Sequence, residues 1–500
     1  MVFNSYIFIF VLLPIALISY FGLNRIKKYT LAKVAVIASS LCFYAYFHLS
    51  YLALIIGSIL FNYGSYRLTI KSKSSKALKT IMALTITANL IVLFIFKYYD
   101  FFISNINNFG FNAPLLNILL PLGISFFTFQ QIGFNIDAYK GKACYLDGKS
   151  YHFIDYTLFV SFFPQLVAGP IVNHKELIPQ FQDQSKKEFN YENFSKGFYS
   201  FVIGLSKKVL IADVFSLAAD YGFSIFNELN TPSAIFVAFV YVIQLYFDFS
   251  GYSDMARGLG FMMNIELPLN FNSPYKTTNL ADFWNHWHIT LSKFFTSYVY
   301  IPLGGNRKGV IRTYIYIFII FTLSGLWHGA EWTYVIWGIL NGIGVIIARF
   351  IKEIFKNKKV NNYIYKIIKP FLIFINFTYF TFTIIIFRSE NLNTAIRFIK
   401  NIFNMNFQYG IFPNIIKNFQ TDEMLLALRL LFLDDFSFSY MLAGLIYFII
   451  AIFIIFFTRN VNEQISDFKP SIKKALYISL LFIWCISSFS GISTFIYYNF

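Results

Sequence analysis

Long apolar runs recur along nearly the whole chain, and they constrain its fold more than any other feature of the sequence. A helix needs about 20 apolar residues to cross the hydrocarbon core of a bilayer. On this criterion we expect about eleven to thirteen membrane-spanning helices. The runs begin near Leu31, Leu52, Leu78 and Leu115, or cover Tyr6–Leu23, Ile235–Tyr246, Ile311–Leu326, Trp332–Ala348, Ile364–Phe387, Tyr440–Phe457 and Leu476–Tyr498.

The content of charged residues leads to the same fold class. Only 13% of the residues carry charge, whereas a soluble domain carries roughly 25%. We therefore predict an all-α polytopic membrane protein in which short re-entrant or interfacial helices surround a central intramembrane site. In this prediction residues 1–500 form one membrane domain, with core motifs in residues 121–338 and flanking helices in residues 1–120 and 339–500.

The placement of basic residues argues against a nucleic-acid-binding protein, although the net charge is +17. Lys and Arg gather in alternate loops between the apolar runs, which is the positive-inside pattern. It predicts a multi-pass protein of the inner (plasma) membrane with its N-terminus on the outer, periplasmic side. The first run is a retained helix, because its basic residues follow it instead of preceding it. The basic segments are residues 25–33, 67–79, 140–149, 307–312, 352–369 and 459–474, and the mixed segment 389–437 is expected to be an outer loop.

Polar residues concentrate in the middle of the chain, between Pro164 and His328. Residues 173–196 mix both signs of charge with aromatic side chains, as an interfacial segment does. Residues 267–283 contain two prolines and cannot form a regular spanning helix. Non-helical backbone at membrane depth is tolerated only where protein or a water-filled cavity satisfies it. We therefore expect the functional site in this part of the chain.

His328 is the first candidate among the six histidines. It ends an apolar run in FTLSGLWHGAEW, residues 321–332. An ionisable residue inside the membrane is expensive and therefore a functional candidate, and a neutral imidazole can accept a proton from a hydroxyl. Gly325 and Gly329 lie four apart on one expected helical face and permit close backbone approach. A histidine that caps a helix end near the interface explains His328 alone equally well.

His288 is the second candidate, in ADFWNHWHITLSKFF, residues 281–295. If this segment is one helix, Trp284, His288 and Ser292 share a face and Asn285 lies beside them. An interfacial aromatic belt explains the tryptophans but not His288. Structural explanations suffice for the remaining histidines, which are His48 and His152 at the ends of spans, His174 in a polar loop and His286 on the opposite helical face.

Charged residues also occur in LYFDFSGYSDMARGLG, residues 245–260. We expect a helix break at Gly251 and an ion pair between Asp254 and Arg257, because unpaired charges in lipid are costly. A structural role for this pair is at least as plausible as a catalytic one. Further along, Arg307 lies in a basic turn that can meet an anionic donor, although the positive-inside pattern explains the turn equally well.

The cysteines and histidines predict no metal centre. Cys42, Cys144 and Cys485 form no disulfide framework and no CxxC motif, and no metal-ligand spacing is present. We expect neither a metal nor a bound cofactor.

Five motifs in the middle of the chain resemble those of membrane-bound O-acyltransferases. The similarity is greatest to the alginate O-acetyltransferase type, which includes peptidoglycan O-acetyltransferases. The motifs occur in family order, and the resemblance covers essentially the whole chain; His286 stands where family members often carry an arginine. They are PLGISFFTFQQIGFNIDAYKG (121–141), FFPQLVAGPIV (162–172), YFDFSGYSDMARGLG (246–260), DFWNHWHITLSKFFTSYVYIPLGGNRKG (282–309) and SGLWHGAEWTYVIWG (324–338).

The resemblance implies a fold, an activity and a pair of site residues. It implies a helical rim around a thin central floor, with a funnel on one side and a donor tunnel on the other. It implies His328 as the intramembrane histidine and His288 as its upstream partner. The acyl group would be acetyl from cytoplasmic acetyl-CoA, relayed through a periplasmic acetyltransferase to an envelope polysaccharide, either peptidoglycan or an alginate-like exopolysaccharide. The D-alanyl transferases of teichoic acid belong to the same wider family but are usually shorter and lack GGNRKG in this form.

The resulting hypothesis is acyl transfer with His328 as general base. His288, with Asn285 nearby, would orient the thioester or stabilise the oxyanion. Trp284, Ser292, Trp327 and Arg307 are candidates for binding substrate or donor. One alternative is a transporter or flippase for a lipid-linked sugar, although such folds often carry matching broken helices in two repeats and here the breaks lie only in the middle. Another is a non-catalytic scaffold for the partner enzyme.

Overall fold

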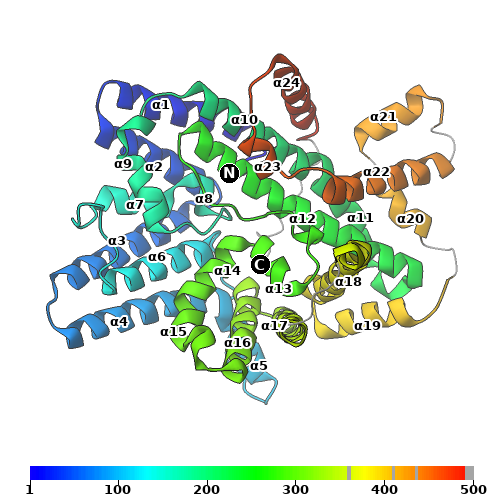
Figure 1. Cartoon of the computed structure of the whole chain (residues 1–500), viewed down its shortest axis with the longest axis horizontal. Helices are drawn as coiled ribbons and strands as arrows, with labels where there is room; N and C mark the ends of the chain where they lie inside the picture. The colour runs from blue at the N-terminus through cyan, green and yellow to red at the C-terminus, as the bar shows by residue number, and fades with distance from the viewer. Residues whose placement is uncertain (357–361, 408–411, 420, 434–436, 490–500) are drawn as a thin grey trace.

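The computed structural model describes residues 1–356, 362–407, 412–419, 421–433 and 437–489 as an assembly of helices (Figure 1). Eight of the helices in these ranges are long and apolar enough to cross a membrane, and the all-α membrane fold is therefore confirmed. They are Phe8–Arg25 (a π-helical turn and α1, Leu13–Arg25), Leu49–Lys71 (α3), Ser75–Asn107 (α4, Ser75–Leu93; a π-helical turn; α5, Tyr99–Asn107), Thr231–Met262 (α12), Val310–His328 (α16), Trp332–Ile354 (α17), Asn362–Arg388 (α18) and Phe438–Phe457 (within α22, Ser437–Phe457).

The other helices are shorter, and several line the interior. They are α2 (Tyr29–Ala45), α6 (Ile124–Tyr139), α7 (Phe153–Ser161), α8 (Phe163–Leu166), α9 (His174–Gln182), α10 (Tyr191–Ser206), α11 (Asp213–Ser224), α13 (Leu280–His286), α14 (Ile289–Phe295), α15 (Ile301–Leu303), α19 (Leu392–Phe403), α20 (Phe412–Lys417), α21 (Asp422–Leu430), α23 (Val461–Ser466) and α24 (Ile472–Ser487).

The eight long apolar helices are fewer than the eleven to thirteen spans expected from the sequence. Helix α2 is apolar but has 17 residues, and the apolar run at 476–498 extends into residues 490–500, which lie outside the described ranges. The expected outer loop at residues 389–437 contains three short helices, α19 to α21, in its described parts.

The span expected near Leu115 does not form. Residues 111–121 have no regular secondary structure, and α6 begins only at Ile124. The Asp100 carboxylate instead accepts the backbone N–H groups of Leu116 (2.7 Å) and Asn117 (2.9 Å). Side-chain acceptors therefore satisfy backbone donors that a helix would have satisfied internally.

Helix α12 runs through the middle of the molecule and is buried along nearly its whole length, with α10 and α11 beside it (Figure 1). The sequence predicted a break in this helix at Gly251, and that prediction is wrong. Gly251 lies within a continuous helix because it meets α10: a Cβ at Gly251 would lie 2.7 Å from the Gly204 carbonyl oxygen, and one at Gly204 would lie 2.6 Å from the Gly251 oxygen. Gly197 and Gly258 repeat this arrangement one step along the interface, at 2.6 Å in both directions.

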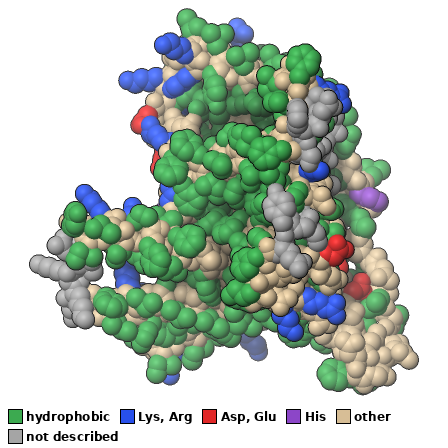
Figure 2. All heavy atoms as spheres, turned by 90° about the vertical axis from the view of Figure 1, so that its right-hand side faces the viewer, with side chains coloured by type: hydrophobic (Ala, Val, Ile, Leu, Met, Phe, Trp, Pro, Cys, Tyr) green, Lys and Arg blue, Asp and Glu red, His purple; other side chains and the backbone are tan. Residues whose placement is uncertain are grey.

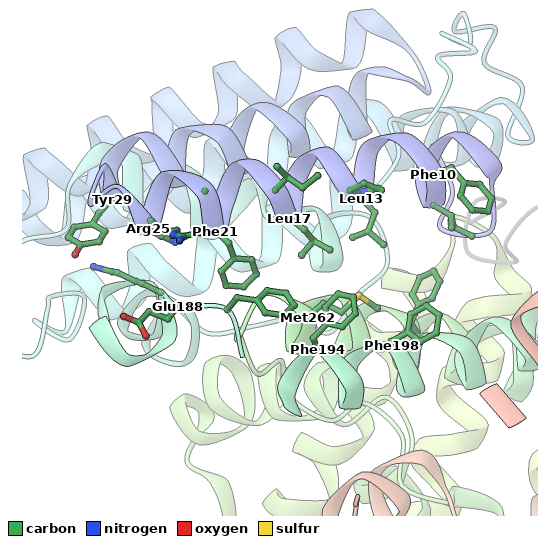
Figure 3. Close-up of a pocket in the computed structure, with 18 of the residues that line it drawn as sticks. Phe10, Leu13, Leu17, Phe21, Arg25, Tyr29, Glu188, Phe194, Phe198 and Met262 are labelled. Carbon is green, nitrogen blue, oxygen red and sulfur yellow. The ribbon is translucent and has the colours of Figure 1, made fainter. Parts of the chain in front are cut away.

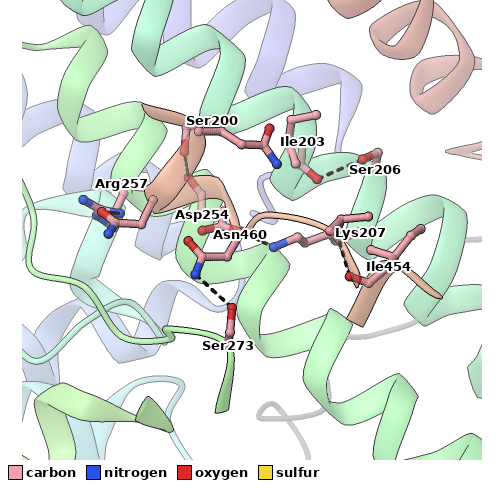
Figure 4. Close-up of polar contacts among 12 residues, drawn as sticks. Ser200, Ile203, Ser206, Lys207, Asp254, Arg257, Ser273, Ile454 and Asn460 are labelled. Carbon is pink, nitrogen blue, oxygen red and sulfur yellow. Dashed lines mark hydrogen bonds and ion pairs between the residues drawn. The ribbon is translucent and has the colours of Figure 1, made fainter. Parts of the chain in front are cut away.

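Buried ion pairs join the same two segments. Lys207 lies 2.6 Å from Asp254, and Lys208 lies 2.7 Å from both Asp213 and Asp248. Figure 4 shows the Lys207 side chain meeting Asp254. The expected pairing of Asp254 with Arg257 is therefore wrong.

Arg257 serves the backbone instead, because its Nε donates to the Leu267 carbonyl oxygen at 3.2 Å. The two lysines begin the π-helical turn Lys207–Ala212, which continues α10. Asp254 thus pairs with Lys207, and Asp213 and Asp248 share Lys208, as the cost of unpaired charge in a membrane requires.

Hydrophobic side chains cover much of the face seen in Figure 2. Large exposed hydrophobic residues also occur on helices throughout the described chain, among them Ile18, Leu430 and Phe453. Contiguous apolar surface of this kind would be unfavourable in water and suits contact with lipid.

Gly251→Ala should destabilise the protein, because the added methyl group would overlap the backbone of α10. Overpacking of this kind costs about 1–3 kcal/mol. The matched control is Gly57→Ala in α3, where no atom lies within 4 Å of the added carbon. Thermal unfolding of the detergent-solubilised protein should show a lower midpoint for Gly251→Ala only, and equal midpoints for the two variants would contradict the close contact.

Candidate active site

The segment that carries His288 is not the single helix expected from the sequence. Helix α13 ends at His286 and α14 begins at Ile289, and between them His288 adopts a left-handed backbone conformation with φ 44°. The chain at residues 270–272 runs alongside this break. The Ile289 N–H donates to the Asn270 carbonyl at 3.0 Å, and the Asn272 N–H donates to the His286 carbonyl at 2.9 Å. These bonds replace helical ones and hold His288 at the joint between two half-helices.

The break changes the surroundings predicted for His288. Asn285 is exposed, whereas His288 is fully buried. Ser292 donates from its hydroxyl to the Trp284 carbonyl at 3.1 Å and ties α14 back to α13. The shared face of Trp284, His288 and Ser292 therefore does not form, and the Ser292 side chain links the two half-helices.

The amide that holds the His288 ring belongs to Asn270. His288 Nδ1 lies 3.2 Å from Asn270 Oδ1, which also accepts the Thr290 N–H at 3.3 Å and the Thr290 hydroxyl at 3.0 Å. The backbone N–H identifies this amide atom as the oxygen, which can only accept. Nδ1 of His288 must therefore carry the proton, and in the neutral ring the lone pair lies on Nε2.

His328 is the last residue of α16 and is also buried. Its ring centroid lies 6.4 Å from that of His288, so the structure brings together the two histidines that the sequence singled out. Trp327 packs on both rings, with centroid distances of 5.8 Å to His288 and 5.0 Å to His328. Trp337 of α17 closes the other side of His328 at 5.0 Å.

Close packing of α16 on α17 positions His328. A Cβ at Gly325 would lie 2.3 Å from the Tyr334 carbonyl oxygen, and one at Gly329 would lie 2.0 Å from the Tyr334 ring. The predicted close approach at both glycines is thus confirmed. Gly329, however, is extended and lies past the end of the helix, so the two do not share a helical face.

Two buried indole groups, those of Trp327 and Trp337, pack on the histidines, and a third, that of Trp284, packs on Trp337. The ring centroid of Trp284 lies 5.7 Å from that of Trp337, and the ring centroid of Trp327 lies 5.0 Å from that of His328. Within the part of the chain that the structure describes, none of these three indole N–H groups donates a hydrogen bond. A buried donor without an acceptor is costly, and a ligand oxygen entering this region can be bound by such donors.

Lys97 lies beside His328, although the prediction from sequence did not single it out. Its ammonium donates to the carbonyl oxygens of Trp327 (2.6 Å) and His328 (3.1 Å), while the Tyr98 hydroxyl donates to Leu326 at 2.9 Å. These contacts cap the final carbonyls of α16. Lys97 and His328 also line a cavity of about 30 Å³. The missed signal was a single lysine inside a long apolar run, which is itself a functional indicator.

A second cavity of about 300 Å³ lies next to the His288 network. Thr290, which is hydrogen bonded to Asn270, lines it together with Lys175 and Lys293. His174 lines it as well; it begins α9, is buried, and contacts Asp137 at 3.3 Å and Tyr151 at 3.1 Å, so its expected place in a polar loop is wrong.

The other predicted residues lie apart from the histidine pair. Arg307 is exposed in the short turn Gly305–Lys308, and no contact described in the structure joins it to His288 or His328. His48 directly precedes the candidate span α3, as expected, whereas His152 precedes α7, which has nine residues and is too short to be a span. His286 is partly exposed and contacts Asp282 at 3.6 Å.

Comparison with known proteins assigns this constellation to a family. The model of the MBOAT, membrane-bound O-acyltransferase family, matches residues 137–389, a range that includes both His288 and His328. A peptidoglycan O-acetyltransferase of Helicobacter pylori is 41% identical over 429 residues, which are 81% of this chain and 80% of the relative. The chain belongs to the membrane-bound O-acyltransferase family. It is therefore an O-acyltransferase, and the family membership inferred from the five motifs is confirmed.

Further relatives lie in two groups. A probable alginate O-acetylase AlgI of Pseudomonas aeruginosa is 37% identical over 410 residues, covering 81% of this chain and 75% of the relative. A teichoic acid D-alanyltransferase of Bacillus subtilis is 27% identical over 285 residues, covering 54% of this chain and 68% of the relative. The similarity to the O-acetylating relatives is thus both higher and longer.

Asn270→Ala should reduce acyl transfer by this O-acyltransferase about tenfold to hundredfold, because loss of buried hydrogen bonds of this kind costs about 1–3 kcal/mol. Asn285→Ala, which removes the exposed asparagine of the same region, should leave transfer nearly unchanged. Both rates are to be measured per amount of folded protein. A larger loss in Asn285→Ala than in Asn270→Ala would favour the sequence-based assignment over the structural one.

Proposed function

We propose that this O-acyltransferase moves an acetyl group from cytoplasmic acetyl-CoA across the inner membrane towards hydroxyl groups of an envelope polysaccharide. The acceptor is peptidoglycan or an alginate-like exopolysaccharide, reached through a periplasmic partner transferase, and the N-terminus lies on the periplasmic side. The acyl group and the acceptor class are supported by the names of the relatives at 41% and 37% identity. The single observation that carries the chemistry is the buried pair of histidines at 6.4 Å between ring centroids.

In the proposed reaction, His328 removes the proton from the acceptor hydroxyl as its oxygen attacks the thioester carbonyl. The carbon–sulfur bond then breaks, and the departing thiolate takes the proton back from His328. No covalent intermediate on this chain is needed. Taking up and returning one proton is the ordinary task of a histidine general base.

The tautomer of His288 refines its proposed part in the reaction. A neutral ring with its proton on Nδ1, held by Asn270, presents a lone pair at Nε2 and accepts hydrogen bonds there. His288 is therefore better suited to orient an O–H or N–H group of a substrate than to stabilise an oxyanion. The indole N–H groups of Trp284, Trp327 and Trp337 are better suited to the developing negative charge, because they are buried donors with no acceptor among the described residues.

The cavity next to Thr290 is the proposed entrance for the donor. Lys175 and Lys293 supply positive charge for the phosphates of coenzyme A, and Thr290 connects the cavity to Asn270 and thereby to His288. Exposed lysines attract phosphate groups as compact point charges. Arg307 adds a further positive charge in the predicted cytoplasmic turn after α15.

The alternatives have less support. The teichoic acid D-alanyltransferase of Bacillus subtilis matches 54% of this chain at 27% identity, and membership of an acyltransferase family does not favour a flippase. A non-catalytic scaffold in the same complex makes a different prediction from an enzyme, because a scaffold tolerates loss of the histidine pair.

His328→Ala should abolish O-acetylation of the polysaccharide in cells that lack the unmodified protein, with a loss of about a hundredfold or more, as expected for removal of a general base. The measurement is the acetate released by mild base from purified peptidoglycan or exopolysaccharide. His286→Ala, which changes a partly exposed histidine nearby, should leave the acetate content intact. Normal acetylation in His328→Ala at equal protein levels would show that the chain acts as a scaffold.

A further inference from the structure

A groove of about 1110 Å³ runs along α1 on the side that faces α10. Helix α1 packs on α2, and the groove separates it from α10 and α24. Figure 3 shows apolar side chains along both walls and polar ones gathered at one end. The apolar part is lined by Leu13, Leu17, Phe21, Phe194 and Phe198, and the polar end by Arg25, Lys27, Tyr29, Lys187 and Glu188.

Lys187 gives the polar end of this groove its chemical character. Only 8% of the residue is exposed, yet no carboxylate among the described residues lies within 4 Å of its ammonium. The ammonium instead lies 3.8 Å from the centroid of the Tyr29 ring. Burial lowers the pKa of Lys187 and the nearby ammonium of Lys33 lowers it further, while the carboxylates of Asp183 and Asp155 offset only part of this effect. A buried cation of this kind requires a counter-ion.

Other charges at this end add to the need for an anion. Arg25 and Lys27 line the groove and are exposed, and neither forms an ion pair with a carboxylate of the described residues. Glu188 is the acidic residue in the lining, and its exposed carboxylate opposes part of this charge. Three cations and one carboxylate leave an excess of positive charge at the end of α1 that the positive-inside pattern predicts to be cytoplasmic.

We propose that the groove binds a phospholipid with an anionic headgroup. The phosphate lies against Lys187, Arg25 and Lys27, and the acyl chains extend past Phe21 towards Leu13 on one wall. Basic pockets between membrane helices on the cytoplasmic side are suited to anionic headgroups. An amphiphile with one charged end and a long apolar part satisfies both ends of the groove at once.

A transmembrane helix of a partner protein fits these observations less well. It would cover the apolar walls but, without a suitably placed carboxylate, would leave Lys187 buried without a counter-ion. The groove is also larger than ordinary small-molecule sites, which measure roughly 300–1,000 Å³, so its size suits a lipid.

The lipid stabilises the gap between α1 and α10 and takes no part in acyl transfer, so this proposal is independent of the proposed function.

The test uses the full chain purified in mild detergent and titrated with phosphatidylglycerol or with phosphatidylcholine of the same acyl chains. Thermal unfolding should shift upward at lower concentrations of phosphatidylglycerol, since a ligand that binds the folded state stabilises it. Native mass spectrometry should resolve a one-to-one lipid adduct. Lys187→Met should weaken phosphatidylglycerol binding about fivefold to tenfold, as expected for loss of one phosphate-facing charge. Lys28→Met, a matched change just outside the groove, should retain full affinity.

Equal shifts with the two lipids, or equal affinities in Lys187→Met and Lys28→Met, would overturn the proposal. If Lys187→Met does not accumulate, Leu17→Trp fills the groove while keeping every charge and should weaken phosphatidylglycerol binding in the same assay; unchanged binding would overturn the proposal. A photo-crosslinker at Leu17 should capture lipid. Capture of a defined protein helix instead would identify a partner subunit as the occupant and reject the lipid.

Discussion

The contact between α10 and α12 is the interaction on which the rest of the structure depends. Two glycines from each helix face each other so closely that no side chain fits between them. In a membrane the hydrophobic effect does not drive helices together, so close backbone packing and satisfied polar groups must do so. The ion pairs of Lys207 and Lys208 join the same segments. Together they fix α12 at the centre, where it carries no lipid-facing surface over most of its length.

The histidine site is built on this fixed helix. Arg257 of α12 holds the chain at Leu267, and the Tyr275 hydroxyl donates to the Val242 carbonyl of α12 at 2.9 Å. Phe249 of α12 packs on the His288 ring at 4.8 Å between centroids. The chain from 263 to 279, which contains no α-helix, is thereby tied to a rigid element, as irregular backbone at membrane depth must be. Lys97 donates to the last carbonyl groups of α16 and thereby helps to hold His328 in place.

The sequence predicted the parts of this site that depend on the cost of polar groups in lipid. The cost of an ionisable group in lipid points to His328, the family resemblance adds His288, and the two rings lie together. The prediction from sequence is wrong where tertiary contacts override the local periodicity of the residues. Helical periodicity placed Asn285 beside His288, but pairing of residues 270–272 with 286–289 breaks the helix and brings Asn270 there instead. The sequence predicts a helix break at Gly251, and this is wrong because the glycine serves a contact with Gly204, which is remote in sequence. The irregular chain near Leu115 is likewise fixed by a side-chain acceptor, Asp100, that composition does not reveal.

The central claim is that two buried histidines connect a donor entrance on one face to an acceptor on the other. The most direct measurement uses proteoliposomes sorted with the basic loops outward, with acetyl-labelled coenzyme A added outside and a partner transferase with its glycan enclosed. The account predicts label on the enclosed glycan and free coenzyme A outside, both lost in His328→Ala and in His288→Ala. Label transferred at the original rate by either variant, or label found only when the glycan itself leaves the lumen, would contradict it.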